Sequence, residues 1–222
     1  MLEITNVSTV GWEDAVRGMR NPLNSWKRID SEYKSTGYDA ERNMSCYSYI
    51  LGENDLGLMK RLYNAGTDHR KFMRMITVYL DINAPLYWWK EFDTYKVGTV
   101  ANSCSTMHKI HAKEFTIDDF SHEHLDSAML LSLQSIIFDL NALRDRYDEN
   151  KDKEVWYQMI QLLPSSYNQK RTVMLNYEVL ANIHKSRRNH KLDEWHTLCD
   201  WIEQLPYFMD IIDDRRDAHE DA

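Results

Sequence analysis

The chain has 222 residues, of which 43% are hydrophobic and 12% aromatic, so it can build a large core without disulfides or a structural metal. Its net charge of −8 disfavours non-specific binding to nucleic acid, whose phosphates require a basic surface. No apolar run approaches the ~20 residues that span a bilayer, and the N-terminus lacks the basic-then-apolar order of a signal peptide. We therefore expect a single soluble, cytoplasmic domain over residues 1–222, with an acidic tail near 213–222 that is frayed.

Other composition features exclude several kinds of site. The cysteines are odd in number and far apart, as is typical of reduced thiols: Cys46, Cys104 and Cys199. His108 and His111 would share a face of a helix, but no third ligand has diagnostic spacing, so we predict no metal site. The P-loop, GxGxxG, GxSxG and kinase motifs are absent. With only seven glycines, the chain must hold any phosphate by side chains and hydroxyls.

The first third of the chain predicts two strands and three helices. β-Branched residues alternate roughly over 2–10 and are frequent in 75–82, as in strands. Three helices are expected: 11–20, about 39–50, and a segment that Asn54 or Asp55 caps and Gly66 ends.

Beyond residue 84 the pattern is mainly helical. A helix of about three turns should follow Pro85, and its paired Trp88 and Trp89 favour core or interface packing over a cofactor platform. Apolar residues at spacings of three and four predict a buried helix over 124–147: Met129, Leu130, Leu133, Ile136, Ile137, Leu140 and Leu143. After a charged connection at 148–154, further helices are expected at 156–164, at 166–187 with Ser165 or Ser166 as the cap, and at 192–205. Strands among about six helices indicate an α+β fold.

The stretch 84–108 is the first candidate for function. It runs from Pro85 through the two tryptophans into a loop of small hydroxylic residues at 97–107. Small polar side chains, Gly98 and free backbone N–H groups suit a loop that wraps a phosphate or a planar ring. A solvated connector is the equal alternative.

The predicted helix 166–187 is the second candidate, because two polar residues interrupt its apolar stripe. Asn176 and Arg187 are eleven residues apart, which places them on one face about 16 Å from each other. Buried Asn and Arg each cost several kcal/mol unless they are paired. Their partner is either a bound ligand or a structural hydrogen-bond network, and Arg187 suits a phosphate or a pyrimidine carbonyl.

The order of these features resembles the flavin-dependent thymidylate synthases. That family has a helix ending in glycine, a polar connector containing histidine, a strand running into AP, and then RHRxxSxNxxSxRY. The corresponding segments here are LMKRLYNAG, TDHRKFMR, MITVYLDINAP and TYKVGTVANSCSTMH. Counting from Ala84, with one inserted residue after the first Ser position, aligns the motif with Thr94, Tyr95 and Lys96 (RHR), Thr99, Asn102, Ser105, and Met107 and His108 (RY).

A second match lies in the C-terminal half. The family has an LP, two asparagines six residues apart that lie against the flavin, and an arginine five residues further that holds and polarises dUMP. Here these are Leu163 and Pro164, Asn176, Asn182 and Arg187. The chain departs from the family where the RHR and SxR arginines are replaced and where Glu178 stands at a usual arginine position. Each lost charge-assisted contact costs ~1.5–3 kcal/mol, which Lys96 and Arg187 could replace in part.

The resemblance implies an α+β fold with a mixed or antiparallel sheet flanked by helices, a helical C-terminal half, and a homotetramer whose sites form between subunits. It implies transfer of a methylene from methylenetetrahydrofolate to C5 of a deoxyuridine nucleotide, with hydride from reduced FAD. The implied substrate residues are Lys96, Thr99, Ser105 and Arg187, the last also catalytic. The implied flavin residues are Tyr95, Asn102, Asn176 and Asn182.

Two alternatives stay open. The chain could keep this fold as a nucleotide-binding or protein-interaction module without catalysis, for instance in a phage or mobile element, with Trp88 and Trp89 serving an interface. It could also act on an altered pyrimidine substrate, such as a modified deoxyuridylate or a deoxycytidylate. Whether the protein is an enzyme therefore depends on how far the lost arginines are replaced.

Overall fold

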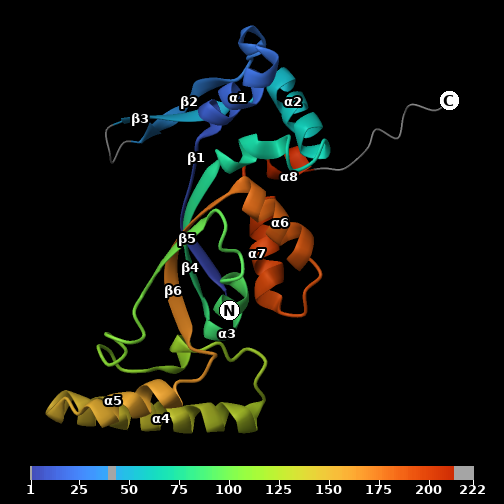
Figure 1. Ribbon diagram of the computed structural model, residues 1–222. Coiled ribbons are helices and arrows are strands. Elements are labelled where there is room, and N and C mark those ends of the chain that lie inside the picture. The colour runs from blue at the N-terminus through green and yellow to red at the C-terminus, as the bar shows by residue number, and fades with distance from the viewer. Residues whose placement is uncertain (1, 40–43, 213–222) are drawn as a thin grey trace. The chain divides into compact units, whose positions relative to one another are not determined.

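A computed structural model describes residues 2–39 and 44–212 (Figure 1). The chain divides into two compact units. The first unit contains Met1–Val7 and Tyr79–Met174, and the second contains Ser8–Val78 and Leu175–Ala222. Within the described ranges, no helix is both long enough and apolar enough to cross a bilayer.

The strands of the described residues form two sheets. A four-stranded sheet has the order β1 (Glu3–Val10), β4 (Thr77–Pro85), β6 (Asn168–Asn176) and β5 (Thr99–Ser103). An antiparallel pair contains β2 (Glu32–Asp39) and β3 (Met44–Ile50). The strands predicted at 2–10 and 75–82 are therefore confirmed as β1 and β4.

The helix predicted at about 39–50 is wrong, because its described residues belong to β2 and β3, and residues 40–43 lie outside the described residues. Tyrosines at alternate positions suit a pleated strand better than a helix. Tyr49 pairs with Tyr33 on β2, and their ring centroids are 5.0 Å apart. Such cross-strand aromatic pairs stabilise a hairpin, which local helix propensity did not reveal.

Most of the other helices were predicted apart from their ends, whereas the last helix of the described residues was not predicted. The α-helices are α1 (Trp12–Arg20), α2 (Glu53–Asn64), α3 (Leu86–Phe92), α4 (Ser127–Asn150), α5 (Lys153–Leu162), α6 (Tyr177–Arg187), α7 (Asp193–Glu203) and α8 (Phe208–Ile212). Short 3-10 turns are η1 (Asn21–Leu23), η2 (Trp26–Arg28), η3 (Arg70–Arg74) and η4 (Ile117–Asp119). Gly66, at φ 104°, follows the end of α2 as predicted, but α3 is shorter than three turns and α2 begins after Gly52. The tail near 213–222 lies outside the described residues.

The helix predicted at 166–187 is wrong over its first half, which forms strand β6. Val173 and Leu175 alternate with more exposed neighbours and are buried, as expected of a strand between two others. Asn176 ends the strand and caps α6, because its side-chain oxygen accepts a hydrogen bond from the N–H of Val179 at 3.1 Å. Ser165 therefore caps no helix, and Asn176 is the cap of α6 rather than a residue within a helix.

Helices α4 and α5 lie side by side in the first unit (Figure 1) and enclose a core of their own. The buried residues of this core are Ile110, Phe115, Phe120, Leu133, Ile137, Leu140, Leu143, Val155 and Met159. The predicted apolar stripe of α4 is thus largely confirmed. Met129, which is 50% exposed, and Leu130, which is partly buried, are not among the residues of this core.

Asp81, on the less buried face of β4, is the centre of a polar network in the first unit. Thr172 donates to its carboxylate at 2.6 Å, Asn6 donates at 2.8 Å, and Lys170 forms an ion pair at 3.0 Å. The hydrogen bond from Thr172, followed by those from Asn6 and Lys170, lowers the pKa of Asp81 to about 2. The network stabilises the ionised carboxylate on the sheet surface.

A buried ion pair connects elements of the second unit. Arg20 at the end of α1 and Asp55 in α2 are 3% and 0% exposed. The Nε and Nη2 atoms of Arg20 both lie 2.6 Å from one carboxylate oxygen of Asp55. The other oxygen accepts from the backbone N–H groups of Asp30 and Ser31 and from the Ser31 hydroxyl. Asp55 therefore links α1, α2 and the segment 30–31 through hydrogen bonds, rather than acting as the predicted cap of α2.

The three thiols lie in different surroundings. Cys46 in the second unit and Cys104 in the first are exposed, whereas Cys199 in the second unit is buried. Burial raises the pKa of the Cys199 thiol to about 11. Cys199 consequently stays protonated and unreactive at neutral pH.

Candidate functional site

Three of the predicted site residues line one cavity in the first unit. The cavity measures about 220 Å³ and lies where the chain leaves α3 and enters β5. It is lined by Phe92, Asp93, Tyr95, Lys96, Thr99 and Ala101. A turn with Gly98 at φ 80° lets the chain reverse so that Lys96 and Thr99 reach the same cavity.

The Thr99 hydroxyl is the most informative atom of this cavity. It is buried and has no hydrogen-bond partner within the described parts of the chain. A buried hydroxyl without a partner costs free energy, and a ligand oxygen or amide would satisfy it. Lys96 is exposed at the same cavity and supplies a positive charge.

Arg171 on β6 contacts one wall of the cavity, and no pattern in the sequence predicted this role. Its guanidinium donates to Asp93 at 2.8 Å and to the Gln169 side chain at 3.0 Å, and lies 4.1 Å from the ring centroid of Trp89. Because Arg171 neutralises Asp93, the charge of Lys96 is not cancelled within the cavity. Trp89 is 1% exposed, so the tryptophan pair belongs to the core, one of the two roles predicted for it.

Two other predicted residues of this segment do not line this cavity, which we call the Lys96 cavity. Asn102 is exposed on β5, which replaces part of the loop predicted at 97–107. The Ser105 hydroxyl oxygen accepts from the backbone N–H groups of Met107 and His108, at 3.2 Å and 2.9 Å. Ser105 therefore shapes the turn that follows it.

The asparagines of the C-terminal match lie in the second unit, around α6. Asn176 uses its side-chain oxygen as the cap of α6, which leaves its amide hydrogens available. Asn182 is exposed, and its side-chain oxygen accepts a hydrogen bond from Arg70 at 3.3 Å. Both asparagines thus have structural partners, which was the alternative expected for Asn176.

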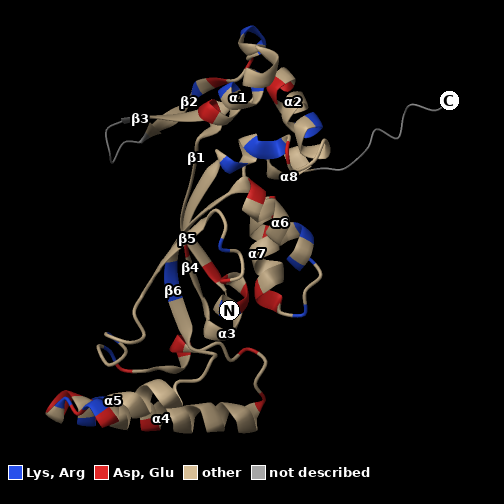
Figure 2. Cartoon of the chain, in the orientation of Figure 1, with Lys and Arg blue, Asp and Glu red and all other residues tan. Residues whose placement is uncertain are grey.

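Arg70 and Arg74, which sequence reasoning missed, surround Glu178. Arg70 lies 3.4 Å from the Glu178 carboxylate, and Arg74 forms a two-pronged ion pair with it. Figure 2 shows acidic colour at the start of α6, whose first turn contains Glu178. Asp68 also interacts with Arg74, so two arginines face two carboxylates beside Asn182.

Arg187 is held at the end of α6 by a stacked aromatic ring. Its guanidinium carbon lies 4.7 Å from the ring centroid of Trp195 in α7, and Trp195 is fully buried. Stacking of this kind fixes the plane of a guanidinium. Arg187 and the asparagines belong to the second unit, and the Lys96 cavity belongs to the first.

Searches by sequence find no relatives: no family model matches the chain, and no curated protein matches it. Structural comparison finds the flavin-dependent thymidylate synthase ThyX from Helicobacter pylori in complex with FAD and dUMP, with a TM-score of 0.66 and 16% identity over 95% of this chain and 98% of that one. A second structure of the same enzyme with FAD and dUMP gives 0.65 and 15%, over 95% and 96%. The chain has the fold of the flavin-dependent thymidylate synthases. The predicted α+β fold and the resemblance are thus confirmed at the level of fold.

Proposed function

We propose that the chain binds a deoxyuridine nucleotide and FAD and methylates the pyrimidine reductively. One observation carries the proposal: three of the residues expected from the motif, Tyr95, Lys96 and Thr99, line a single cavity with an unsatisfied buried hydroxyl. The fold of the chain, shared with ThyX structures that contain FAD and dUMP, supports the same class of ligands.

In this proposal the chain's own residues bind and orient the substrate. Lys96 and the Thr99 hydroxyl hold anionic or carbonyl oxygens of the nucleotide. Arg187, fixed by Trp195, donates to a pyrimidine carbonyl and so stabilises negative charge that develops on the ring when C5 reacts. The residues that would hold FAD are Tyr95, Asn102, Asn176 and Asn182.

The reaction balances with two co-reactants. C5 of the uracil loses a proton and gains the methylene carbon of methylenetetrahydrofolate, and tetrahydrofolate leaves. FAD, when bound in its reduced form, would supply the hydride that completes the methyl group and would itself be oxidised. We further propose a homotetramer, which light scattering of the purified chain would test.

The first test measures binding. Purified protein with added FAD should retain flavin absorbance after gel filtration, and dUMP should raise the melting temperature, because a ligand of the folded state stabilises it. Lys96→Gln should reduce the effect of dUMP by about tenfold in affinity, the size of one charge-assisted contact. The matched control is Lys90→Gln, which removes an exposed charge from α3 outside the cavity. A folded protein that takes up no FAD and does not respond to dUMP would refute the proposal.

A second candidate function is nucleotide binding without turnover. The observation that favours it is Glu178, a carboxylate at a position where the family has an arginine, locked between Arg70 and Arg74. Release of tritium from dUMP labelled at C5, in the presence of FADH2 and methylenetetrahydrofolate, distinguishes the two functions. Release supports the enzyme, and a dUMP-dependent thermal shift without release supports the binding module. Parallel titrations with deoxycytidylate and modified deoxyuridylates test an altered substrate.

A further inference from the structure

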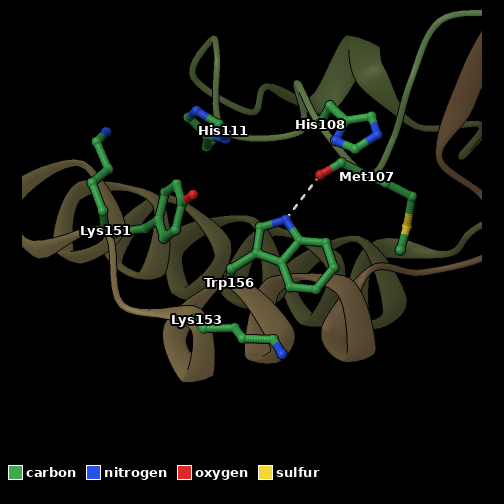
Figure 3. A pocket seen from close by; sticks show the side chains of 7 residues that line it. Met107, His108, His111, Lys151, Lys153 and Trp156 are labelled. Carbon is green, nitrogen blue, oxygen red and sulfur yellow. Dashed lines mark hydrogen bonds between the residues drawn. The ribbon is translucent and has the colours of Figure 1, made fainter.

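A second cavity in the first unit lies between the loop after β5 and the turn that joins α4 to α5 (Figure 3). It measures about 240 Å³ and is lined by Met107, His108, His111, Tyr147, Lys151, Lys153 and Trp156. Apart from Met107 and His108, these residues fall between the two segments that carry the family resemblance. The sequence suggested only a solvated connection at 148–154.

The loop wall of this cavity is fixed by specific contacts. Trp156 donates its indole N–H to the backbone carbonyl of Met107 at 2.8 Å, as Figure 3 shows. Ile110 is buried in the core of α4 and α5. The Asn141 side chain both donates to and accepts from the backbone of Phe115, each at 2.9 Å. The cavity is therefore formed before any ligand arrives, which reduces the entropy lost on binding.

The polar groups that line the cavity are donors or can become donors. His111 and His108 lie on the loop above Trp156, and Lys151 extends toward the His111 side (Figure 3). The Nδ1 atom of His111 is buried and has no hydrogen-bond partner among residues 2–39 and 44–212. No carboxylate is among the lining residues. In a chain with net charge −8, an acid-free cavity with lysine and histidine side chains is suited to an anion.

Lys151 and Lys153 differ in where their charges lie relative to the cavity. Lys151 has φ 53° at the end of α4, and its ammonium forms an ion pair with Asp148 at 2.8 Å. Asp148 does not line the cavity, so it competes with a bound anion for Lys151. Lys153 lies below Trp156 in Figure 3, and its ammonium is 5.4 Å from the Tyr157 ring centroid, so its stem rather than its charge faces the cavity.

We propose that this cavity is an oxyanion site that takes a phosphate group, held by Lys151, the two imidazoles and the Tyr147 hydroxyl. A volume of about 240 Å³ accommodates free phosphate or the phosphate of a small ester. The aromatic face of Trp156 offers a surface for an organic group on such an ester. The site is separate from the Lys96 cavity and does not depend on the proposed methylation.

The test titrates inorganic phosphate into the full chain by calorimetry, with sodium chloride adjusted to keep ionic strength constant. Imidazole NMR signals of His108 and His111 report where phosphate binds. Lys151→Gln should weaken binding by about tenfold or more, and Asp148→Asn should strengthen it, because it releases Lys151 from its competitor. The matched controls are Lys109→Gln in the same loop and Asp145→Asn on α4, neither of which lines the cavity. Both controls should stay within about twofold of the wild type.

Each result decides the proposal. Opposite effects of Lys151→Gln and Asp148→Asn, with unchanged controls, support it. Equal effects of Lys109→Gln and Lys151→Gln would show general charge attraction, and the absence of saturable binding to the wild type would also overturn it. Phenyl phosphate distinguishes the two sources of the phosphate group. If it binds about tenfold more tightly than phosphate, and this gain is lost in Trp156→Leu, the ligand is an aromatic ester. If the two ligands bind with equal affinity, the ligand is free phosphate. Melting temperatures confirm that each variant is folded.

Discussion

Replacing Asp55 by asparagine should destabilise the second unit strongly, although the two side chains have nearly the same shape. Asp55 is 0% exposed, and both of its oxygens accept hydrogen bonds. One oxygen faces two N–H groups of Arg20, and the other faces three donors from Asp30 and Ser31. An amide turns an NH2 group toward one of these donor sets and leaves the Arg20 charge without its counter-ion.

The expected loss follows from that geometry. Breaking a buried ion pair by removal of one partner costs about 3–5 kcal/mol. For a chain of this size, 1 kcal/mol corresponds to roughly 2–4 °C, so the melting temperature should fall by roughly 10 °C. Urea unfolding followed by tryptophan fluorescence gives the free energy of unfolding directly. The double variant Arg20→Met with Asp55→Leu should recover part of the loss, because no buried charge remains.

The control removes the same charge from an exposed pair. Asp14 and Arg17 on α1 form an ion pair with side chains 56% and 61% exposed, so Asp14→Asn should cost less than about 1 kcal/mol. If Asp55→Asn lowered the free energy of unfolding no more than this control does, the buried ion pair would not stabilise the second unit as its contacts indicate. An unchanged melting temperature would refute the reasoning equally.

Three further predictions concern acid stability, the charge at position 178 and the stacked arginine. The folded pKa of Asp81 is about 2, below the unfolded value of about 3.9. The ionised carboxylate therefore stabilises the fold above about pH 4, and this stabilisation is lost as the pH falls toward 2. The urea concentration at the midpoint of unfolding should fall over that pH interval in the wild type, and should fall less in Asp81→Asn. Glu178→Arg, although it restores the family residue, should lower the melting temperature more than Glu178→Gln, because it places a third cation beside two arginines. A melt at raised salt should narrow that difference. Arg187→Lys should lower the affinity for dUMP by about tenfold with little change in melting temperature. Lysine has no planar guanidinium that could stack on Trp195. An unchanged affinity would show that Arg187 does not contact the nucleotide.

Periodic segments were predictable because their burial pattern is local. Helix α7 has buried residues at Trp195, Leu198 and Ile202, which the spacing in the sequence predicts. β6 was mistaken for a helix because Val173, Leu180 and Ile183 also fit a helical period. Only the neighbouring strands β4 and β5, which are distant in sequence, decide that the segment is extended.

The candidate site shows the same division between local and distant information. Tyr95, Lys96 and Thr99 are close in sequence, so a motif could locate them before the cavity was known. Arg171 joins the wall of the cavity through side chains on other elements, and no spacing in the sequence relates it to Asp93. Long flexible cations such as arginine are hard to place because their partners are set by tertiary packing.

The distribution of thiols allows spectroscopy on the unmodified protein. Cys104 belongs to the first compact unit and Cys46 to the second, and both are exposed, whereas Cys199 is buried with a raised thiol pKa. A maleimide or nitroxide reagent at neutral pH should therefore attach two labels and leave the third thiol untouched. The native chain thus supports a distance measurement between its two units, with and without nucleotide, and needs no engineered cysteine.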